Sequence, residues 1–255
     1  MQEHPYFKKD KVIILAHRGS TPPTENTLEA FQKAISAGVE YLETDVRLTL
    51  DGQAVLVHDE DLNRIAGVHS KVSALTLEEL QRLDLPQVGK ITSLQQALST
   101  FPKARFNIDI KVPEAVLPTV EVIEQLKAHD RVLVSSFSNS TRKQALSFFS
   151  RPVATSASSS LVLKAKLLSW LGFNLDKTLQ GVGALQLPTK MYGLNFKAKR
   201  FIHKVLATGT QLHYWTINDP DEMHRLIALG ASGIVTDNVA MAKKVVNSLA
   251  KNGNN

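Results

Sequence analysis

The sequence of 255 residues contains no cysteine, which excludes disulfide scaffolds, thiolate zinc sites, iron–sulfur clusters and cysteine nucleophiles. Any metal ion must therefore be held by oxygen atoms or imidazole nitrogens. Long apolar runs are also missing, because charged residues interrupt the N-terminal stretch before it reaches the length of a signal peptide or a membrane-spanning helix. We therefore expect a soluble, cytoplasmic protein, or a periplasmic one if a signal peptide has been removed.

The balance of charge is slightly basic, with 30 Lys and Arg against 24 Asp and Glu. A small excess of this kind is typical of scattered surface lysines. No basic run is interleaved with aromatic residues in the manner of nucleic-acid-binding modules, so we expect no nucleic-acid partner. The hydrophobic fraction of 43% is sufficient for a globular core.

Short apolar runs alternate with longer amphipathic segments along most of the chain, which predicts repeated βα units around a parallel sheet. Nine runs are predicted as strands: residues 12–17, 41–48, 54–59, 104–111, 131–137, 152–156, 183–187, 211–217 and 233–237. The second and third are separated by too few residues for a parallel crossover, so these two must form an antiparallel hairpin. The remaining eight predict an α/β fold, the (β/α)₈ or TIM barrel.

The predicted hairpin turns at Asp51-Gly52, a dipeptide typical of tight turns between strands. Folding the two strands about this dipeptide places Asp45 opposite His58. The hairpin would therefore leave the rim of the barrel and return His58 to the level of Asp45.

The hairpin begins an insertion in the barrel. Thr76-Leu77-Glu78-Glu79 has the pattern of a capping box and predicts a small helical cap over residues 76–83. A further helix is predicted over residues 27–37, and we expect Asn26 to cap it. The chain is thus predicted to be one barrel domain over residues 1–255, with the hairpin and helical cap inserted at about residues 50–102 after the second barrel strand.

Three carboxylates stand near the ends of predicted barrel strands, where barrel enzymes carry their catalytic residues. Glu43 and Asp45 share one face of their strand, and Asp109 shares a face with Lys111 on the next. Taken singly, each acid is explained by an ion pair with a nearby arginine or lysine. Taken together at one barrel mouth, they repel one another and require compensation by a cation or by protons. Oxygen ligands suit a hard ion, so Glu43, Asp45 and Asp109 are predicted to bind one divalent metal ion, Mg²⁺ or Ca²⁺.

A series of short motifs runs through the chain in a fixed order. They are Ala16-His17-Arg18-Gly19, Thr24-Glu25-Asn26-Thr27, Leu42-Glu43-Thr44-Asp45-Val46, Asp51-Gly52, Val57-His58-Asp59, Asp109-Ile110-Lys111, Val134-Ser135-Ser136-Phe137, Trp215-Thr216-Ile217-Asn218 and Gly233-Ile234-Val235-Thr236-Asp237. Taken as an ordered set, they resemble the glycerophosphodiester phosphodiesterase family. Asp109 departs from that family, which more often has Glu at this position, and the change shortens the reach to a metal by one methylene.

The resemblance implies a metal-dependent hydrolase that cleaves glycerophosphodiesters to sn-glycerol 3-phosphate and an alcohol. It implies acid–base roles for His17 and His58, and a reaction in which a glycerol hydroxyl attacks first to form a cyclic phosphate that water then opens. Which histidine is the base in which step is left open. Arg18 and Lys111 are expected to bind the phosphate, since guanidinium and ammonium groups both recognise phosphate oxygens.

Two residues and one segment leave alternatives open. Glu25 either orients Arg18 or interacts with the dipole of the following helix, and Trp215 either lines the substrate pocket or packs in the core. Residues 160–173 are apolar and basic, and form either an outer helix packed on the barrel or an interfacial helix that contacts a membrane. The second reading favours a lysophospholipase D acting on lysophospholipids. A noncatalytic anion-binding barrel is the alternative from another functional class.

Overall fold

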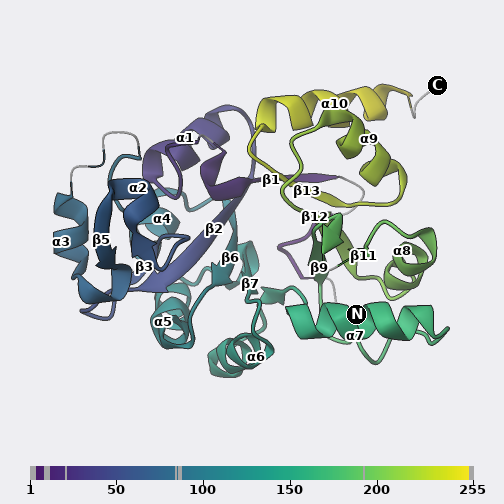
Figure 1. Cartoon of the computed structure of the whole chain (residues 1–255), viewed down its shortest axis with the longest axis horizontal. Coiled ribbons are helices and arrows are strands. Elements are labelled where there is room, and N and C mark those ends of the chain that lie inside the picture. The colour runs from purple at the N-terminus through teal and green to yellow at the C-terminus, as the bar shows by residue number, and fades with distance from the viewer. Residues whose placement is uncertain are drawn as a thin grey trace.

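The computed structural model describes residues 4–8, 12–20, 22–83, 85, 88–191 and 193–252, with side chains as far as residue 249. Eight parallel strands form a ring with helices on its outside (Figure 1). Around the ring these strands are β8 (Ala154–Thr155), β7 (Val132–Ser135), β6 (Arg105–Ile110), β2 (Tyr41–Leu48), β1 (Ile13–Ala16), β13 (Gly233–Thr236), β12 (Gln211–Tyr214) and β9 (Ala184–Leu187). A parallel bridge between Ser156 and Ala184 joins β8 to β9. The ring is therefore nearly closed, and the predicted TIM barrel is confirmed.

The outer layer consists of helices that turn their apolar side chains toward the strands. They are α1 (Leu28–Ser36), α4 (Leu94–Thr100), α5 (Val116–Gln125), α6 (Asn139–Phe148), α7 (Ser159–Trp170), α8 (Lys199–Leu206), α9 (Pro220–Ala228) and α10 (Val239–Asn252), with short 3₁₀ turns η1 (His17–Gly19), η3 (Pro113–Ala115) and η4 (His129–Arg131). In α1, for example, Phe31 is buried and meets Phe106 of β6 edge-on at 5.6 Å between ring centroids. In the part of the chain that the structure describes, no helix has the length and apolar character needed to cross a membrane.

Side chains that point into the barrel fill its amino-terminal end. Leu15, Tyr41 and Val235 belong to this inner core, and the buried ring of Tyr6 packs against them. The Tyr41 hydroxyl donates a hydrogen bond of 2.8 Å to the backbone carbonyl of Tyr6. This end of the barrel is therefore closed by packed aromatic rings.

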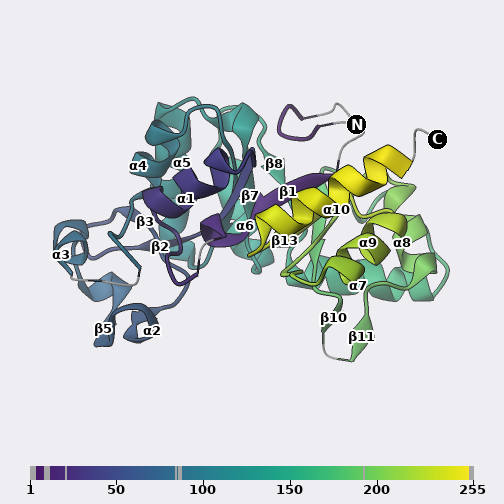
Figure 2. The same cartoon turned by 90° about the horizontal axis from the view of Figure 1, so that it is seen from above.

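The insertion after β2 forms a small lobe with its own core. It contains β3 (Ala54–Leu56), β4 (Asp61–Leu62), α2 (Asn63–Ala66), β5 (Val68–Lys71), η2 (Val72–Ala74) and α3 (Leu77–Arg82). The capping box predicted at Thr76 is present at the start of α3. Leu62, Val72 and Leu80 are buried within this lobe, whereas α4 packs into the outer layer of the barrel. Figure 2 shows the lobe beside the barrel, and the short hairpin of β10 (Lys190–Met191) and β11 (Leu194–Asn195) projecting from the same end.

The strands β2 and β3 pair antiparallel as predicted, but the predicted register is wrong by one residue. Asp45 accepts a backbone hydrogen bond of 3.1 Å from Val57, not a pairing with His58. The turn is longer than the dipeptide alone indicates, because the backbone of Thr49 donates to the carbonyl of Gln53 at 3.1 Å, enclosing three residues. The Thr49 hydroxyl also accepts from the Gln53 N–H at 2.8 Å and fixes this loop length. His58 reaches the barrel mouth from the chain that continues beyond the end of β3.

Candidate active site

A pocket of about 200 Å³ lies at the carboxyl ends of the barrel strands. Eight of the nine predicted site residues line it: His17, Arg18, Glu43, Asp45, His58, Asp109, Lys111 and Trp215. The ninth, Glu25, lies directly behind Arg18 and binds its guanidinium group. Residues predicted from five separate segments of the sequence are thus brought together at one place.

The pairing of β2 with β6 sets the heights of the acidic side chains. Glu43 is level with Asn107, and Asp45 is level with Asp109, because these residues are partners in the parallel register. All four are buried. Asn107 was not predicted as a site residue, yet it lines the pocket and its side-chain oxygen has no hydrogen-bond partner within the described residues.

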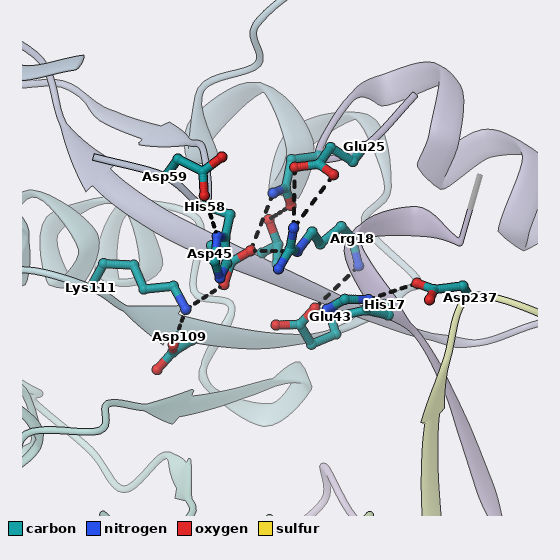
Figure 3. A network of polar contacts seen from close by, with 12 residues as sticks. His17, Arg18, Glu25, Glu43, Asp45, His58, Asp59, Asp109, Lys111 and Asp237 are labelled. Carbon is teal, nitrogen blue, oxygen red and sulfur yellow. Dashed lines mark hydrogen bonds and ion pairs between the residues drawn. The ribbon is translucent and has the colours of Figure 1, made fainter. Parts of the chain in front are cut away.

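Two cations interleave with the carboxylates (Figure 3). The Lys111 Nζ lies 2.7 Å from Asp45 Oδ1 and 2.7 Å from Asp109 Oδ2. The Arg18 Nε forms an ion pair of 3.2 Å with the other oxygen of Asp45. Burial would raise the pKa of Asp45, but Lys111 and Arg18 hold it below its usual range. Asp45 is therefore ionised and serves as the centre of this cluster.

The other two carboxylates lack such full compensation. Burial, followed by repulsion from Asp45, raises the pKa of Glu43 to about 7. Burial also raises the pKa of Asp109, although Lys111 acts in the opposite direction. Raised carboxyl pKa values mean that negative charge is unfavourable at these two positions, and an additional cation would relieve that cost.

The donor set has the chemistry of a site for a hard divalent cation. It offers three buried carboxylates and the unpartnered side-chain oxygen of Asn107, and Mg²⁺ and Ca²⁺ prefer oxygen ligands. Among the side chains that the structure describes, no three His, Asp or Glu groups are gathered closely enough to hold a metal ion in the present arrangement. The Lys111 ammonium instead lies between Asp45 and Asp109. The residue types fit a metal ion, and the conformation shown is one in which Lys111 bridges two of them.

His17 is held by a carboxylate from the far end of the sequence. It lies in η1, directly after β1, and its Nδ1 is 2.7 Å from Asp237 Oδ1. Asn218 donates a hydrogen bond of 2.8 Å to the other oxygen of Asp237. Burial lowers the pKa of His17, but the hydrogen bond to Asp237, assisted by Glu43, outweighs it and raises the pKa above its usual value. With Nδ1 occupied, Nε2 is the ring nitrogen left to act in the pocket.

His58 has a similar support from its neighbour in sequence. Its Nδ1 lies 2.7 Å from Asp59 Oδ1, and Arg64 Nε donates to Asp59 Oδ2 at 2.5 Å. Arg64 also donates to Glu25 at 2.6 Å, and Glu25 in turn accepts from Arg18 at 3.3 Å. A continuous chain of charged groups therefore links His58 to Arg18 through Asp59, Arg64 and Glu25. Figure 3 shows its two ends, His58 with Asp59 and Glu25 with Arg18. Glu25 is placed to orient two arginines.

The backbone at the end of β1 is bent so that Arg18 faces the pocket. Arg18, Gly19 and Ser20 have positive φ values of 48°, 89° and 57°. Gly19 packs against α1, and a Cβ added there would lie 2.6 Å from the Cβ of Ala30, so only glycine fits. The same turn directs the Arg18 N–H to Glu43 Oε2 at 3.1 Å. The His-Arg-Gly run thus forms a tight corner that fixes both a backbone donor and a guanidinium.

The prediction that Asn26 caps the following helix is wrong. Thr27 is the N-cap of α1, and its hydroxyl accepts a hydrogen bond of 3.1 Å from the Ala30 N–H. The side chain of Asn26 instead donates to Asp45 Oδ2 at 3.3 Å and accepts from the Thr44 hydroxyl at 2.7 Å. Asn26 is free to bind a buried carboxylate because the next residue, a threonine, is also a favoured N-cap residue.

One wall of the pocket is apolar. Phe137, Val162, Met191 and Trp215 contribute to it, and the rings of Phe137 and Trp215 meet edge-on at 6.0 Å. Trp170, in the segment predicted as an outer or interfacial helix, is 72% exposed and is not among the lining residues. The polar cluster and the apolar wall give the pocket two chemically different halves.

Three residues that support the site were not predicted. Asp59 and Asp237 stand within the recognised motifs, and Asp237 is the last residue of a predicted strand. That position at a barrel mouth is a signal that could have identified Asp237. Arg64 lies in the inserted lobe, and its local sequence carries no sign that it reaches Glu25 and Asp59.

Comparison with known proteins gives consistent matches over most of the chain. The profile of the glycerophosphoryl diester phosphodiesterase family matches residues 17–241. A probable glycerophosphodiester phosphodiesterase 2 of Mycobacterium tuberculosis is 36% identical over 238 residues, which cover 92% of this chain and 90% of the relative. A lysophospholipase D of Rattus norvegicus is 28% identical over 275 residues, covering 92% of this chain and 86% of the relative. The crystal structure of a glycerophosphodiester phosphodiesterase from Thermotoga maritima is 29% identical with a TM-score of 0.76, covering 93% of this chain and 100% of that one.

Proposed function

This chain belongs to the glycerophosphoryl diester phosphodiesterase family and is an enzyme of that class, and we propose how its pocket cleaves a glycerophosphodiester to sn-glycerol 3-phosphate and an alcohol. One observation carries the proposal. Two histidines, each held at Nδ1 by an aspartate at 2.7 Å, line a single pocket together with a buried cluster of carboxylates and cations (Figure 3). This arrangement offers two proton-transfer groups and a charged anion-binding centre in the same pocket.

Arg18 and Lys111 are proposed to bind the phosphate oxygens. A phosphodiester carries one negative charge, and more charge accumulates on its nonbridging oxygens as the nucleophile attacks. Guanidinium and ammonium groups that are already in position stabilise this charge without reorganisation. Glu25 holds the Arg18 guanidinium from behind at 3.3 Å, so the fork remains directed into the pocket.

Glu43, Asp45 and Asp109 are proposed to hold one divalent metal ion, Mg²⁺ or Ca²⁺. When bound, such an ion supplies positive charge next to the phosphate and polarises the groups that it touches. The raised pKa values of Glu43 and Asp109 support this assignment, because they record carboxylates with too little compensating charge. The shorter side chain of Asp109, compared with the Glu that is more common in this family, leaves its role as a ligand to be tested by substitution.

His17 and His58 are proposed to exchange the protons. In the first step, one imidazole takes the proton of a glycerol hydroxyl, that oxygen attacks the neighbouring phosphorus, and the other imidazolium gives a proton to the departing alcohol oxygen. In the second step, the proton movements reverse, and water opens the cyclic phosphate to sn-glycerol 3-phosphate. Asp237 and Asp59 keep each ring in the tautomer and orientation that leave Nε2 facing the reacting groups.

A lysophospholipid is the second candidate substrate. The apolar wall of Phe137, Val162, Met191 and Trp215 could accept part of an acyl chain while the phosphate binds at the polar half. The similarity to a lysophospholipase D supports this candidate. The polar half is common to both candidates, so the catalytic roles proposed above do not depend on which one is used.

The test is release of glycerol 3-phosphate from glycerophosphocholine, and of lysophosphatidic acid from lysophosphatidylcholine, with EDTA and with added Mg²⁺ or Ca²⁺. We expect chelation to abolish activity and either metal to restore it. His17→Ala and His58→Ala should each lower kcat by about 100-fold or more, the range typical of removing a general acid or base. His69→Ala, which removes an exposed histidine in the inserted lobe, should leave kcat unchanged.

Three outcomes would change the proposal. Activity that resists EDTA would overturn the metal assignment. Cleavage of the acylated substrate alone would make lysophospholipase D the main function. No release from either substrate by folded, metal-loaded protein would contradict the catalytic roles and favour the noncatalytic anion-binding barrel.

A further inference from the structure

The outer face of α7 is apolar, which is unusual for a helix on the outside of a barrel. Eleven large hydrophobic side chains are exposed in the described part of the chain, and five of them lie between residues 163 and 173. We call these five the α7 face: Leu163, Leu167, Trp170, Leu171 and Phe173. Leu163, Leu167 and Trp170 follow one another at helical spacing, so they form one continuous stripe. Trp170 is 72% exposed and Leu167 is 54% exposed.

The exposed stripe is not the face by which α7 packs on the barrel. Val162, Ala165 and Ser169 are buried against the barrel, at positions three or four residues apart. The packing face of the helix is therefore already satisfied. Exposed apolar patches of this kind mark surfaces that bind other molecules.

The surroundings of the α7 face are strongly basic. Residues 131–218 contain 12 Lys and Arg but a single acidic residue, Asp176. The rest of the chain has the opposite balance, with 18 Lys and Arg against 23 Asp and Glu. The net positive charge of the protein is thus concentrated in the half that carries α7 and α8, which lie side by side along one edge of the molecule (Figure 1).

Two of these cations lie at the carboxyl-terminal end of the α7 face. Lys204 of α8 donates hydrogen bonds of 2.6 Å to the carbonyls of both Gly172 and Phe173. The Arg200 guanidinium lies beside Gly172, since it would be 3.4 Å from a Cβ placed there. Lys164 is exposed next to Leu163 on the helix itself. Apolar side chains and cations are therefore interleaved within one surface.

We propose that the α7 face binds the surface of an anionic lipid bilayer. A surface that inserts Trp, Phe and Leu side chains while its Lys and Arg side chains meet acidic headgroups has the composition of an interfacial membrane-binding helix. A second copy of the chain is a poorer occupant, because pairing two such faces would bring like charges together. The surface lies outside the catalytic cluster, so this proposal does not rest on the roles assigned to the histidines.

Binding in this way would place the pocket close to the lipid. Ser159 and Val162, in the first turns of α7, line the pocket, and Trp170 ends the same helix. A helix of 12 residues is about 18 Å long, so the exposed stripe begins beside the pocket and extends away from it by no more than that distance. The pocket and the bound lipid surface would therefore lie within about one helix length of each other.

The test is cosedimentation with vesicles in the absence of any substrate. The protein should bind vesicles that contain phosphatidylglycerol, bind much less to pure phosphatidylcholine vesicles, and be released as salt is raised. Leu167→Gln combined with Trp170→Gln should lower the vesicle partition coefficient by about tenfold or more, because two apolar side chains that would insert into the bilayer are lost. The tryptophan emission should shift to the blue on binding, and Trp170→Phe should abolish the shift.

Leu117→Gln is the matched control. Leu117 is 50% exposed on α5, and Glu114 and Glu121 stand nearby in the sequence, so its loss should not alter vesicle binding. Both the double variant and the control should hydrolyse glycerophosphocholine at the wild-type rate, which shows that they are folded and keeps this test separate from that of the proposed function.

Four results would overturn the proposal. Three concern vesicles: equal binding of the double variant and the wild type, equal binding to both vesicle types, or loss of binding in the Leu117→Gln control. The fourth is a wild-type protein that is dimeric without lipid and becomes monomeric in the double variant. The proposal would also be wrong if a nucleic acid displaced the protein fully from the vesicles and still bound the double variant. The partner would then be a nucleic acid and not a lipid surface.

Discussion

Replacing Asp237 by asparagine tests whether His17 transfers a proton. The substitution keeps the shape of the side chain but removes the charge that lies 2.7 Å from His17 Nδ1. A hydrogen bond to a charged group contributes about 1 to 2 kcal/mol more than a neutral one, so stabilisation of the imidazolium should fall by that amount. The corresponding decrease in kcat is about 5- to 30-fold. Binding of substrate should change little, because Asp237 is not among the residues that line the pocket.

The pH dependence gives a second and more specific readout. Burial lowers the pKa of His17, and at present Asp237 more than reverses that effect. Without the Asp237 carboxylate, burial is opposed by Glu43 but no longer by Asp237, so the limb of the kcat/KM profile that belongs to His17 should move to lower pH in Asp237→Asn.

The assay is initial-rate hydrolysis of glycerophosphocholine between pH 5 and 9. Asp219→Asn removes the same charge from an exposed helix cap nearby and serves as the control. An unchanged kcat together with an unmoved pH profile in Asp237→Asn would refute the reasoning, because Asp237 would then have no influence on the proton-transfer step.

Two further predictions concern stability. Lys111→Met removes the cation between Asp45 and Asp109, and breaking a buried pair of this kind costs about 3 to 5 kcal/mol, so the unfolding temperature should fall. Added Mg²⁺ or Ca²⁺ should raise the unfolding temperature of the variant more than that of the wild type. An equal rise in both proteins, measured by thermal melts, would contradict a shared site for Lys111 and the metal. His213 is fully buried, and burial lowers its pKa to about 3. Between that value and the usual 6.5, the unfolded chain binds a proton that the folded protein does not, so the folded state loses stability as pH falls, by about 2 kcal/mol at pH 5. His213→Gln should reduce the difference in unfolding free energy between pH 7.5 and pH 5 measured in urea, and an unchanged difference would show that other groups cause it.

The strands of the barrel could be predicted because each is a short apolar run between polar turns. This held even for β6, where Asn107 and Asp109 interrupt the apolar pattern but point to the pocket. The hairpins β4–β5 and β10–β11 were not predicted, since their residues are mostly exposed or half-buried and form no apolar run. The register of β2 against β3 was missed because the Asp51-Gly52 dipeptide marks the place of a turn and not the number of residues that it encloses.

The candidate site was predictable where chemistry and motif coincide in one segment. His17, Glu43 and Asp45 are of this type. The groups that hold them were harder to identify, because a local pattern does not record which distant side chain will meet it. His17 and Asp237 are 220 residues apart, and only the neighbouring positions of β1 and β13 in the ring bring them together. Asn26 was misread for the opposite reason, since its local position is that of a cap and its actual partner is on β2.

The ring of strands is uneven in strength. β2 and β6 are joined over six residue pairs, whereas β8 has two residues and meets β9 through the single bridge between Ser156 and Ala184. Short strand pairings open locally at a lower cost in free energy than long ones. Opening of the ring should therefore cost the least free energy at the bridge between Ser156 and Ala184, and α7 begins three residues after that bridge, at Ser159.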